Sequence, residues 1–182
     1  MVKHMKILVI GAGHAGVEAA LASARMGMDT TLLTMDEHRI ASMPCNPSIG
    51  GPAKGIVVRE IDALGGQMGI TSDRTALQFK KLNSTKGPGV QCLRIQSDKI
   101  EYAKMMDQVV HNTPNLSVKS CIVTEVLSEN NRVTGVKTQA QEIIPADAII
   151  VTAGTYMSSK ILVGSSAISS GPEEQPTTNL LS

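Results

Sequence analysis

The sequence predicts an α/β fold with a parallel sheet and an inserted β-hairpin, and three observations support this prediction. The apolar run Ile7–Ile10 is followed by a glycine-rich turn and then by an alanine-rich segment with helical spacing. A second apolar run at residues 30–33 completes a strand–helix–strand unit, whose two strands are parallel and whose crossover is almost always right-handed. Later in the chain, Asn130-Asn131 separates two strand-like segments and predicts a tight turn between them.

The remaining elements follow from the same reading of apolar spacing and of glycine and proline positions. We expect strands at 6–10, 30–33, 116–118, 122–127, 132–138 and 148–152, and helices at 14–26, 56–64 and 96–111. The segments 34–54 and 71–94 are expected to be largely irregular. A connection as long as 34–54 inside a compact domain usually carries function.

The composition excludes several classes of protein. The 182 residues, 42% hydrophobic and 18% charged, are typical of a globular chain, and the net charge of +1 gives no global indication of a nucleic-acid or membrane partner. Three scattered cysteines without a Cys-x-x-Cys pair predict neither a disulfide framework nor a zinc site. No apolar stretch is long enough to span a bilayer. We therefore expect a cytoplasmic protein with no metal and no membrane partner.

The glycine-rich turn carries the first functional prediction. Gly11, Gly13 and Gly16 have the spacing Gly-x-Gly-x-x-Gly between a strand and a helix. The first glycine permits a tight turn, the second lets the backbone approach a pyrophosphate, and the third lets helix and strand pack closely. The N-terminus of the following helix attracts phosphate. We predict that a dinucleotide binds at Gly11, Ala12, Gly13, His14, Ala15 and Gly16, where His14 caps the helix or contacts the cofactor rather than acting as a base.

The acidic residue that usually binds the ribose hydroxyls in such folds lies about twenty residues after the glycines. Here Thr34 directly follows the second strand, and Asp36 and Glu37 come next. The sequence leaves open whether one of these acids binds ribose or whether both are exposed loop charges.

Two features favour FAD over NAD as the dinucleotide. The long insertion after the second strand is typical of folds that cover an extended flavin. The late strand 148–152 ends in Ala153-Gly154, which resembles an element of flavoproteins with two dinucleotide sites. The predicted fold is therefore a Rossmann-like FAD-binding fold with a parallel sheet and a β-hairpin or meander insertion.

A second group of motifs is far more specific. It comprises Cys45-Asn46-Pro47-Ser48-Ile49-Gly50-Gly51, Lys54-Gly55, the run Glu60–Gly69, Leu82–Pro88 and Gln91–Arg94. Together with the glycine turn, these motifs closely resemble the glucose-inhibited division protein A family, the flavin-binding subunit of the bacterial tRNA uridine 5-carboxymethylaminomethyl modification enzyme. The resemblance extends from about Met5 to about Val163. Ala12 stands where the family often has glycine, and Gln91–Arg94 is commonly more basic in the family.

The resemblance implies an enzyme that adds a carboxymethylaminomethyl-type group at C5 of the wobble uridine of tRNA. It implies FAD as redox cofactor, NADH as its reductant, a folate one-carbon donor, a GTPase partner (MnmE) and a homodimer. By the same resemblance, the turn 11–16 contacts the FAD pyrophosphate and the backbone of Val123 meets the adenine. Asn46, Pro47 and Cys45 would lie near the isoalloxazine ring, and Lys54 and Lys86–Pro88 would border the substrate cleft.

For two sets of side chains, the sequence leaves two possible roles open. Cys45 is a candidate catalytic residue whose thiolate would attack C6 of the uracil, or a small residue that shapes the flavin pocket. The basic residues Lys80, Lys81, Lys86 and Arg94 form either a solvated face or a surface for tRNA phosphates.

The family is much longer than this chain, so we expect residues 1–164 to be the N-terminal part of an FAD-binding domain and 165–182 to be a truncated connecting segment. The isolated piece is expected to be inactive. Two alternatives remain from the sequence: a fragment of a generic FAD- or NAD-dependent oxidoreductase, and a nucleotide-binding module that catalyses nothing.

Overall fold

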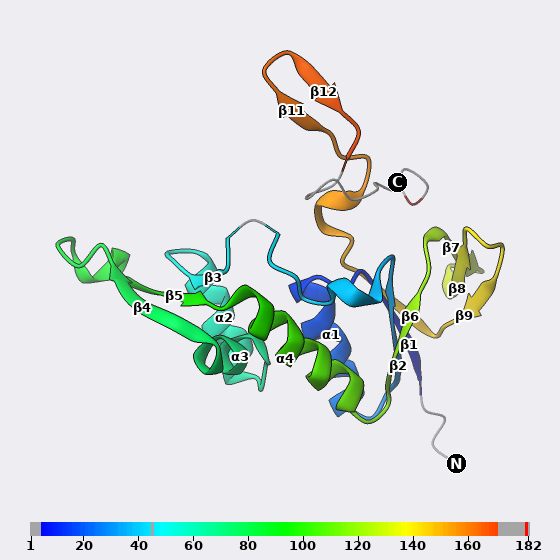
Figure 1. Ribbon diagram of the computed structural model, residues 1–182. Helices are drawn as coiled ribbons and strands as arrows, with labels where there is room; N and C mark the ends of the chain where they lie inside the picture. The colour runs from blue at the N-terminus through cyan, green and yellow to red at the C-terminus, as the bar shows by residue number, and fades with distance from the viewer. Residues whose placement is uncertain (1–4, 45, 171–180, 182) are drawn as a thin grey trace. The chain divides into compact units, whose positions relative to one another are not determined.

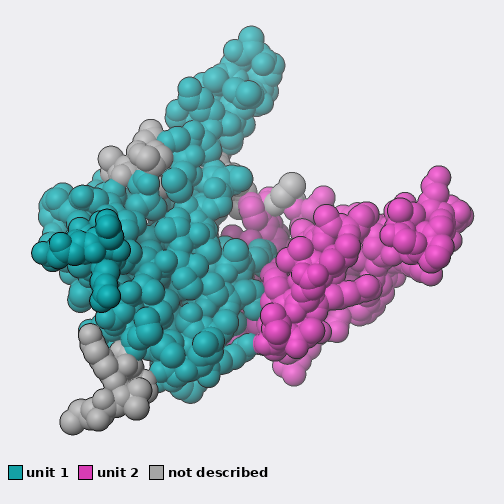
Figure 2. Space-filling model, turned by 180° about the vertical axis from the view of Figure 1, so that it is seen from behind, with its two compact units in different colours: residues 1–41, 110–182 teal, residues 42–109 magenta. Residues whose placement is uncertain are grey.

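The computed structural model describes residues 5–44, 46–170 and 181 (Figure 1). The chain divides into two compact units, residues 1–41 with 110–182, and residues 42–109 (Figure 2). We call them unit 1 and unit 2 and describe each by itself. Among the described residues, no helix combines the length and the apolar character that crossing a membrane requires.

Unit 1 is built on a four-stranded parallel sheet with the strand order β10-β1-β2-β6. Its strands are β1 (Lys6–Ile10), β2 (Asp29–Thr34), β6 (Leu116–Ser120) and β10 (Ala148–Val151). The central strand β1 is buried from Ile7 to Ile10, as expected for a strand of a parallel sheet that is covered on both faces. The predicted strand–helix–strand unit is confirmed.

Helix α1 (His14–Arg25) connects β1 to β2 and buries a face that combines small residues with Val17 and Leu21. Val17, Ala20, Leu21 and Ala24 are almost fully shielded from solvent, whereas Ala15 and Ala22 of the alanine-rich pattern are exposed. The helix ends at Met26, and Gly27 follows with a φ of 82°, the left-handed conformation that commonly terminates helices.

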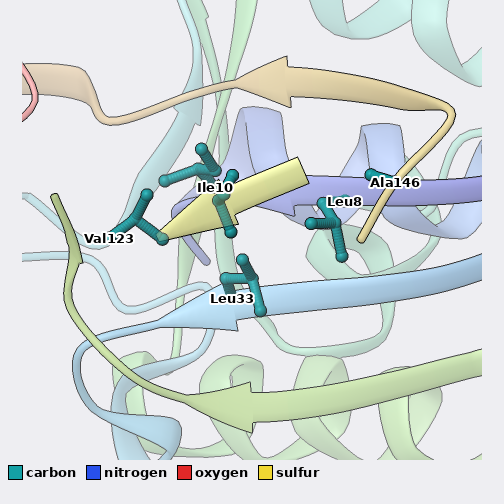
Figure 3. Close-up of a cluster of buried hydrophobic side chains, with 6 residues drawn as sticks. Leu8, Ile10, Leu33, Val123 and Ala146 are labelled. Atoms are coloured by element: carbon teal, nitrogen blue, oxygen red, sulfur yellow. The ribbon is translucent and has the colours of Figure 1, made fainter. Parts of the chain in front are cut away.

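The inserted hairpin is a three-stranded antiparallel meander of β7 (Val123–Glu129), β8 (Arg132–Thr138) and β9 (Ile143–Pro145). Asn130 and Asn131 form the predicted turn with φ values of 50° and 60°, which suit a two-residue hairpin. Val123, Val136 and Ala146 pack against Leu8, Ile10 and Leu33 of the parallel sheet. Figure 3 shows the labelled members of this cluster, Leu8, Ile10, Leu33, Val123 and Ala146. The predicted fold class, a parallel sheet with a β-meander insertion, is confirmed.

Unit 2 contains a three-stranded antiparallel sheet with the order β3-β5-β4. Its elements are β3 (Ser48–Gly50), α2 (Lys54–Ala63), α3 (Met68–Arg74), β4 (Ala76–Leu82), β5 (Cys92–Ser97) and most of α4 (Lys99–Asn112). Its buried side chains include Ile49, Ile95, Tyr102 and Met106.

Shorter elements complete the chain. These are the 3₁₀ helices η1 (Glu37–Arg39), η2 (Pro88–Val90) and η3 (Gly154–Tyr156) and the hairpin of β11 (Ile161–Val163) and β12 (Ser166–Ile168).

The irregular structure expected for residues 71–94 is wrong, because this segment contains most of α3, all of β4 and the start of β5. Strand β4 has no fully buried residue, and Lys80-Lys81 interrupts its alternation of apolar and polar side chains. An exposed edge strand of this kind gives no clear period of two in the sequence. Strands β3, β9, β11 and β12 were not expected either, since three residues are too few to show a period.

Candidate functional site

The glycine turn lies where the central strand of the parallel sheet ends and α1 begins. The backbone N–H of Gly11 donates a hydrogen bond of 2.8 Å to the carbonyl of Leu33, the residue next to the end of β2. Ligands of open parallel sheets bind at this carboxyl edge. The fold therefore places the turn where a nucleotide is expected.

Gly11 and Gly16 are required by the packing of the turn itself. Gly11 has a φ of 103°, which a residue with a side chain adopts only under strain. A Cβ atom on Gly16 would lie 1.7 Å from the carbonyl oxygen of Gly11 and 2.7 Å from Oγ1 of Thr152. The start of α1 thus rests directly on the turn, with no space for a methyl group.

Thr152, directly after β10, holds the same turn from the other side. Its Oγ1 lies 2.8 Å from the carbonyl oxygen of Ile10 and 3.0 Å from that of Gly11, so its single hydroxyl proton is shared between two acceptors. The backbone N–H of Thr152 also donates to Ile10. Sequence reasoning identified the strand and its Ala153-Gly154 ending but missed this hydroxyl, although a threonine at the end of a buried strand was a usable signal.

Gly13 differs from the other two glycines. It is the N-cap residue of α1 with φ −69° and ψ −179°, a conformation open to any residue, and a Cβ atom there would meet no atom within 4 Å. The fold alone therefore does not require glycine at position 13. A ligand that approaches the backbone closely would require it.

The first turn of α1 is suited to an anion. The helix has no side-chain cap and no acidic residue in its first turn. The first N–H groups of a helix, here including those of the exposed Ala15 and the buried Gly16, have no acceptor within the helix and can donate to a bound anion. These features fit the pyrophosphate of a dinucleotide.

Because the N-cap is Gly13, the expectation that His14 caps the helix is wrong. His14 is the half-buried first residue of α1, and its contact with the cofactor stays a prediction.

The acidic residues after β2 have a local structural role. Oδ1 of Asp36 accepts a 2.9 Å hydrogen bond from the backbone N–H of His38, and Oδ2 lies 3.4 Å from Nε of Arg39. Asp36 is therefore the N-cap of η1. Glu37 is exposed at the start of the same 3₁₀ helix.

Val123 lies at the same edge of the sheet as the turn, although it is more than a hundred residues away in sequence. Its side chain is 5% exposed and belongs to the cluster that contains Ile10 and Leu33, the residues at the carboxyl ends of β1 and β2 (Figure 3).

The neighbouring Cys121 donates a hydrogen bond from its backbone N–H to the carbonyl of Thr34. Burial raises the pKa of the Cys121 thiol, which disfavours its thiolate form.

The other residues implied by the family resemblance lie in unit 2. Asn46 is exposed and Pro47 is half-buried, with the carbonyl of Pro47 accepting a 2.8 Å hydrogen bond from Ser97. Nζ of Lys54 donates to the carbonyl of Ser48 at 3.3 Å. Cys45 lies outside the described residues, so its proposed roles stay predictions.

Comparison with known proteins identifies the family. The model of the family described as glucose inhibited division protein A matches residues 6–182. The chain belongs to this family. The chain is 54% identical over its whole length to the tRNA uridine 5-carboxymethylaminomethyl modification enzyme MnmG of Mycoplasma mycoides and 53% identical over 91% of its length to that of Lacticaseibacillus paracasei. It spans 29% and 26% of those proteins, respectively.

Solved structures agree with the family assignment. GidA of Aquifex aeolicus superposes with a TM-score of 0.90 at 46% identity, covering 98% of this chain and 30% of that protein. The GidA-related protein of Thermus thermophilus superposes with a TM-score of 0.67 at 18% identity, covering 96% of this chain and 64% of that protein, which shows a shared fold.

Substituting Gly16 by alanine is expected to destabilise unit 1 strongly, because the new methyl group would overlap the Gly11 carbonyl. We expect a loss of about 3 kcal/mol or more in the free energy of unfolding, measured by urea denaturation. Gly13→Ala is the matched control and is expected to cost about 1 kcal/mol or less, since its methyl group meets no atom. Equal losses for both variants would contradict the packing described here.

Substituting Thr152 by valine removes the shared hydroxyl while keeping the shape of the side chain. We expect a loss of about 1 kcal/mol in the free energy of unfolding, because the Gly11 carbonyl loses its hydrogen bond from this hydroxyl. Thr152→Ser keeps the donor and is expected to retain more of the stability than the valine variant. A valine variant as stable as the unmodified chain would show that the hydroxyl does not hold the turn.

Proposed function

We propose that this chain is the FAD-binding part of an enzyme that adds a carboxymethylaminomethyl-type group at C5 of the wobble uridine of tRNA. The observation that carries the proposal is the turn 11–16, which the fold builds at the carboxyl edge of a parallel sheet in a member of this family. Relatives that are 54% and 53% identical bear the name of the tRNA uridine modification enzyme. A more distant neighbour with the same type of fold, CtdE, was solved in complex with FAD, at a TM-score of 0.53 and 17% identity.

The chain's own residues would bind and orient the cofactor. The N–H groups at the start of α1 would donate to the pyrophosphate oxygens, and Gly13 would leave room for the phosphates against the backbone. Val123 is proposed to meet the adenine through its backbone, and Asn46 and Pro47 to lie near the isoalloxazine ring. Bound FAD would supply the redox chemistry.

The remaining parts of the proposal concern the whole protein. Because the chain covers less than a third of its relatives, we assign NADH reduction of the flavin, the folate one-carbon donor, the MnmE contact and the homodimer to the full-length enzyme in the cytoplasm. We propose that residues 1–164 serve FAD binding and that 165–182 connect onward. The isolated chain is expected to bind cofactor without completing the reaction.

The direct test is the visible absorbance of the purified chain after incubation with FAD and gel filtration. We expect flavin to elute with the protein. A folded chain that elutes without flavin would show that these residues do not retain FAD by themselves, and would contradict the proposal for the isolated chain.

Gly13→Ala separates cofactor binding from folding. Because position 13 is open in the fold, we expect the unfolding free energy to fall by about 1 kcal/mol or less. FAD affinity is expected to fall about tenfold or more, since the methyl group would occupy the space of the pyrophosphate. The measurement is a fluorescence titration of FAD with each protein. Equal affinities for both proteins would remove the proposed role of Gly13.

Cys45 is proposed as the nucleophile that adds to C6 of the uracil and so activates C5. Cys45→Ser in the full-length enzyme is expected to abolish modification while FAD binding persists, measured by nucleoside analysis of tRNA. Cys92→Ser is the control, because Cys92 is half-buried within β5 and has no proposed role. Normal modification by the Cys45 variant would leave only a packing role for this residue.

A further inference from the structure

The ribbon of β4 and β5 in the antiparallel sheet of unit 2 is rich in positive charge. The ribbon of β4 and β5 (Figure 1) and its flanks, residues 75–97, contain Lys80, Lys81, Lys86 and Arg94 and no aspartate or glutamate, whereas the whole chain has a net charge of only +1. Within the described part of the chain, no ion pair involves any of these four side chains.

The strand register places two of these cations side by side. Lys80 of β4 is the direct cross-strand partner of Arg94 on β5, so both side chains leave the same face of the sheet. Like charges at directly opposed positions destabilise a sheet. An anion bound between them would turn this unfavourable pair into a favourable one.

Arg94 is held in place for such a contact. Its Nη2 donates a 3.0 Å hydrogen bond to Oγ of Ser48, which is only 8% exposed on the neighbouring strand β3. Nζ of Lys54 also reaches Ser48, through its carbonyl oxygen. One guanidinium edge is thus fixed on a buried hydroxyl, and the group retains further N–H donors in the planar fork that suits phosphate.

The neighbouring residues favour a polymer over a small anion. Gln78 and Gln96 are cross-strand partners on the same face as the cation pair and offer uncharged donors and acceptors. Exposed Lys86 adds positive charge in the turn that follows β4, and exposed Lys81 adds it on the opposite face of this edge strand. A single pyrophosphate needs one cluster, whereas cations spaced along a ribbon match the successive phosphates of a nucleic-acid strand.

We propose that this face of the β3-β5-β4 sheet binds the RNA backbone, with Lys80 and Arg94 together holding one phosphodiester. The inference rests on the proposed function, since it assigns the surface that contacts the tRNA. It adds residues of β4 and β5 to the substrate site and gives Ser48 the role of a positioning residue for Arg94.

The test measures binding of a fluorescein-labelled tRNA anticodon arm to this chain by anisotropy over a series of salt concentrations. Each phosphate contact with single-stranded RNA contributes about 0.7 to the slope of log affinity against log salt. The double variant Lys80→Gln/Arg94→Gln is expected to lower the slope by about 0.7, the contribution of one shared phosphate. Lys104→Gln is the matched control, because it removes a charge on α4 that pairs with Glu101 and is expected to leave the slope unchanged.

The single variant Lys80→Gln controls for misfolding, since no hydrogen bond or ion pair of the Lys80 side chain occurs within the described residues. It is expected to weaken RNA binding with an unchanged unfolding transition. An unchanged slope in the double variant, an equal decrease in Lys104→Gln, or no RNA binding by the unmodified chain would overturn the proposal. Displacement of the RNA by inorganic phosphate or NADH at the same concentration of phosphate groups would assign the site to small phosphates and would also overturn it.

FAD retention, measured on the same samples, separates this inference from the proposed function. If the unmodified chain retains flavin but the Lys80→Gln/Arg94→Gln variant has the same salt slope as the unmodified chain, only the proposed RNA surface is rejected. Loss of flavin binding by the unmodified chain, with the predicted slope change intact, would reject only the proposed cofactor site.

Discussion

The structure of unit 1 depends on one close approach, that of Gly16 at the start of α1 to the carbonyl of Gly11 at the end of β1. No side chain fits between them, since a Cβ atom would lie 1.7 Å from the carbonyl oxygen. This contact fixes where the helix begins relative to the central strand. The hydroxyl of Thr152, directly after β10, donates to this turn, and the N–H of Gly11 donates to the carbonyl of Leu33 in β2. Three adjacent strands of the sheet, β10, β1 and β2, therefore determine the position of the turn.

A turn held in this way can bind an anion with little rearrangement. The N–H groups at the start of α1 are directed by the helix axis, which the packing against the sheet fixes. The meander β7-β8-β9 supports the same edge, because Val123 shares a buried cluster with Ile10 and Leu33 (Figure 3). Binding groups that are ordered before the ligand arrives lose less conformational entropy when it binds. The glycine spacing and the apolar cluster thus hold one rigid turn, which we propose as the phosphate cradle.

The sequence predicted the parts whose signals are local. The alanine-rich helix, the buried strands and the Asn130-Asn131 turn each show a period or a turn residue within a few positions, and the structure confirms them. The Thr152 contact and the Lys80–Arg94 pair could not be read in this way. Both depend on strand pairing between segments that are separated in the sequence. In addition, β4 is an exposed edge strand, so its sequence lacks a clear apolar alternation and was expected to be irregular. At Gly13 the sequence motif is more informative than the packing. The motif predicts a glycine where the backbone approaches a pyrophosphate, whereas the packing of the fold would accept a Cβ atom there.

The central claim is that the turn 11–16 is a preformed cradle for the pyrophosphate of FAD. Backbone amide NMR of the chain during an FAD titration tests it most directly, because each N–H group of the turn reports separately. The account predicts that the largest shift changes fall on Gly13, Ala15 and Gly16, with little change at Lys104 in α4. Saturating FAD that leaves the amides of the turn unmoved, or moves only amides elsewhere, would contradict it.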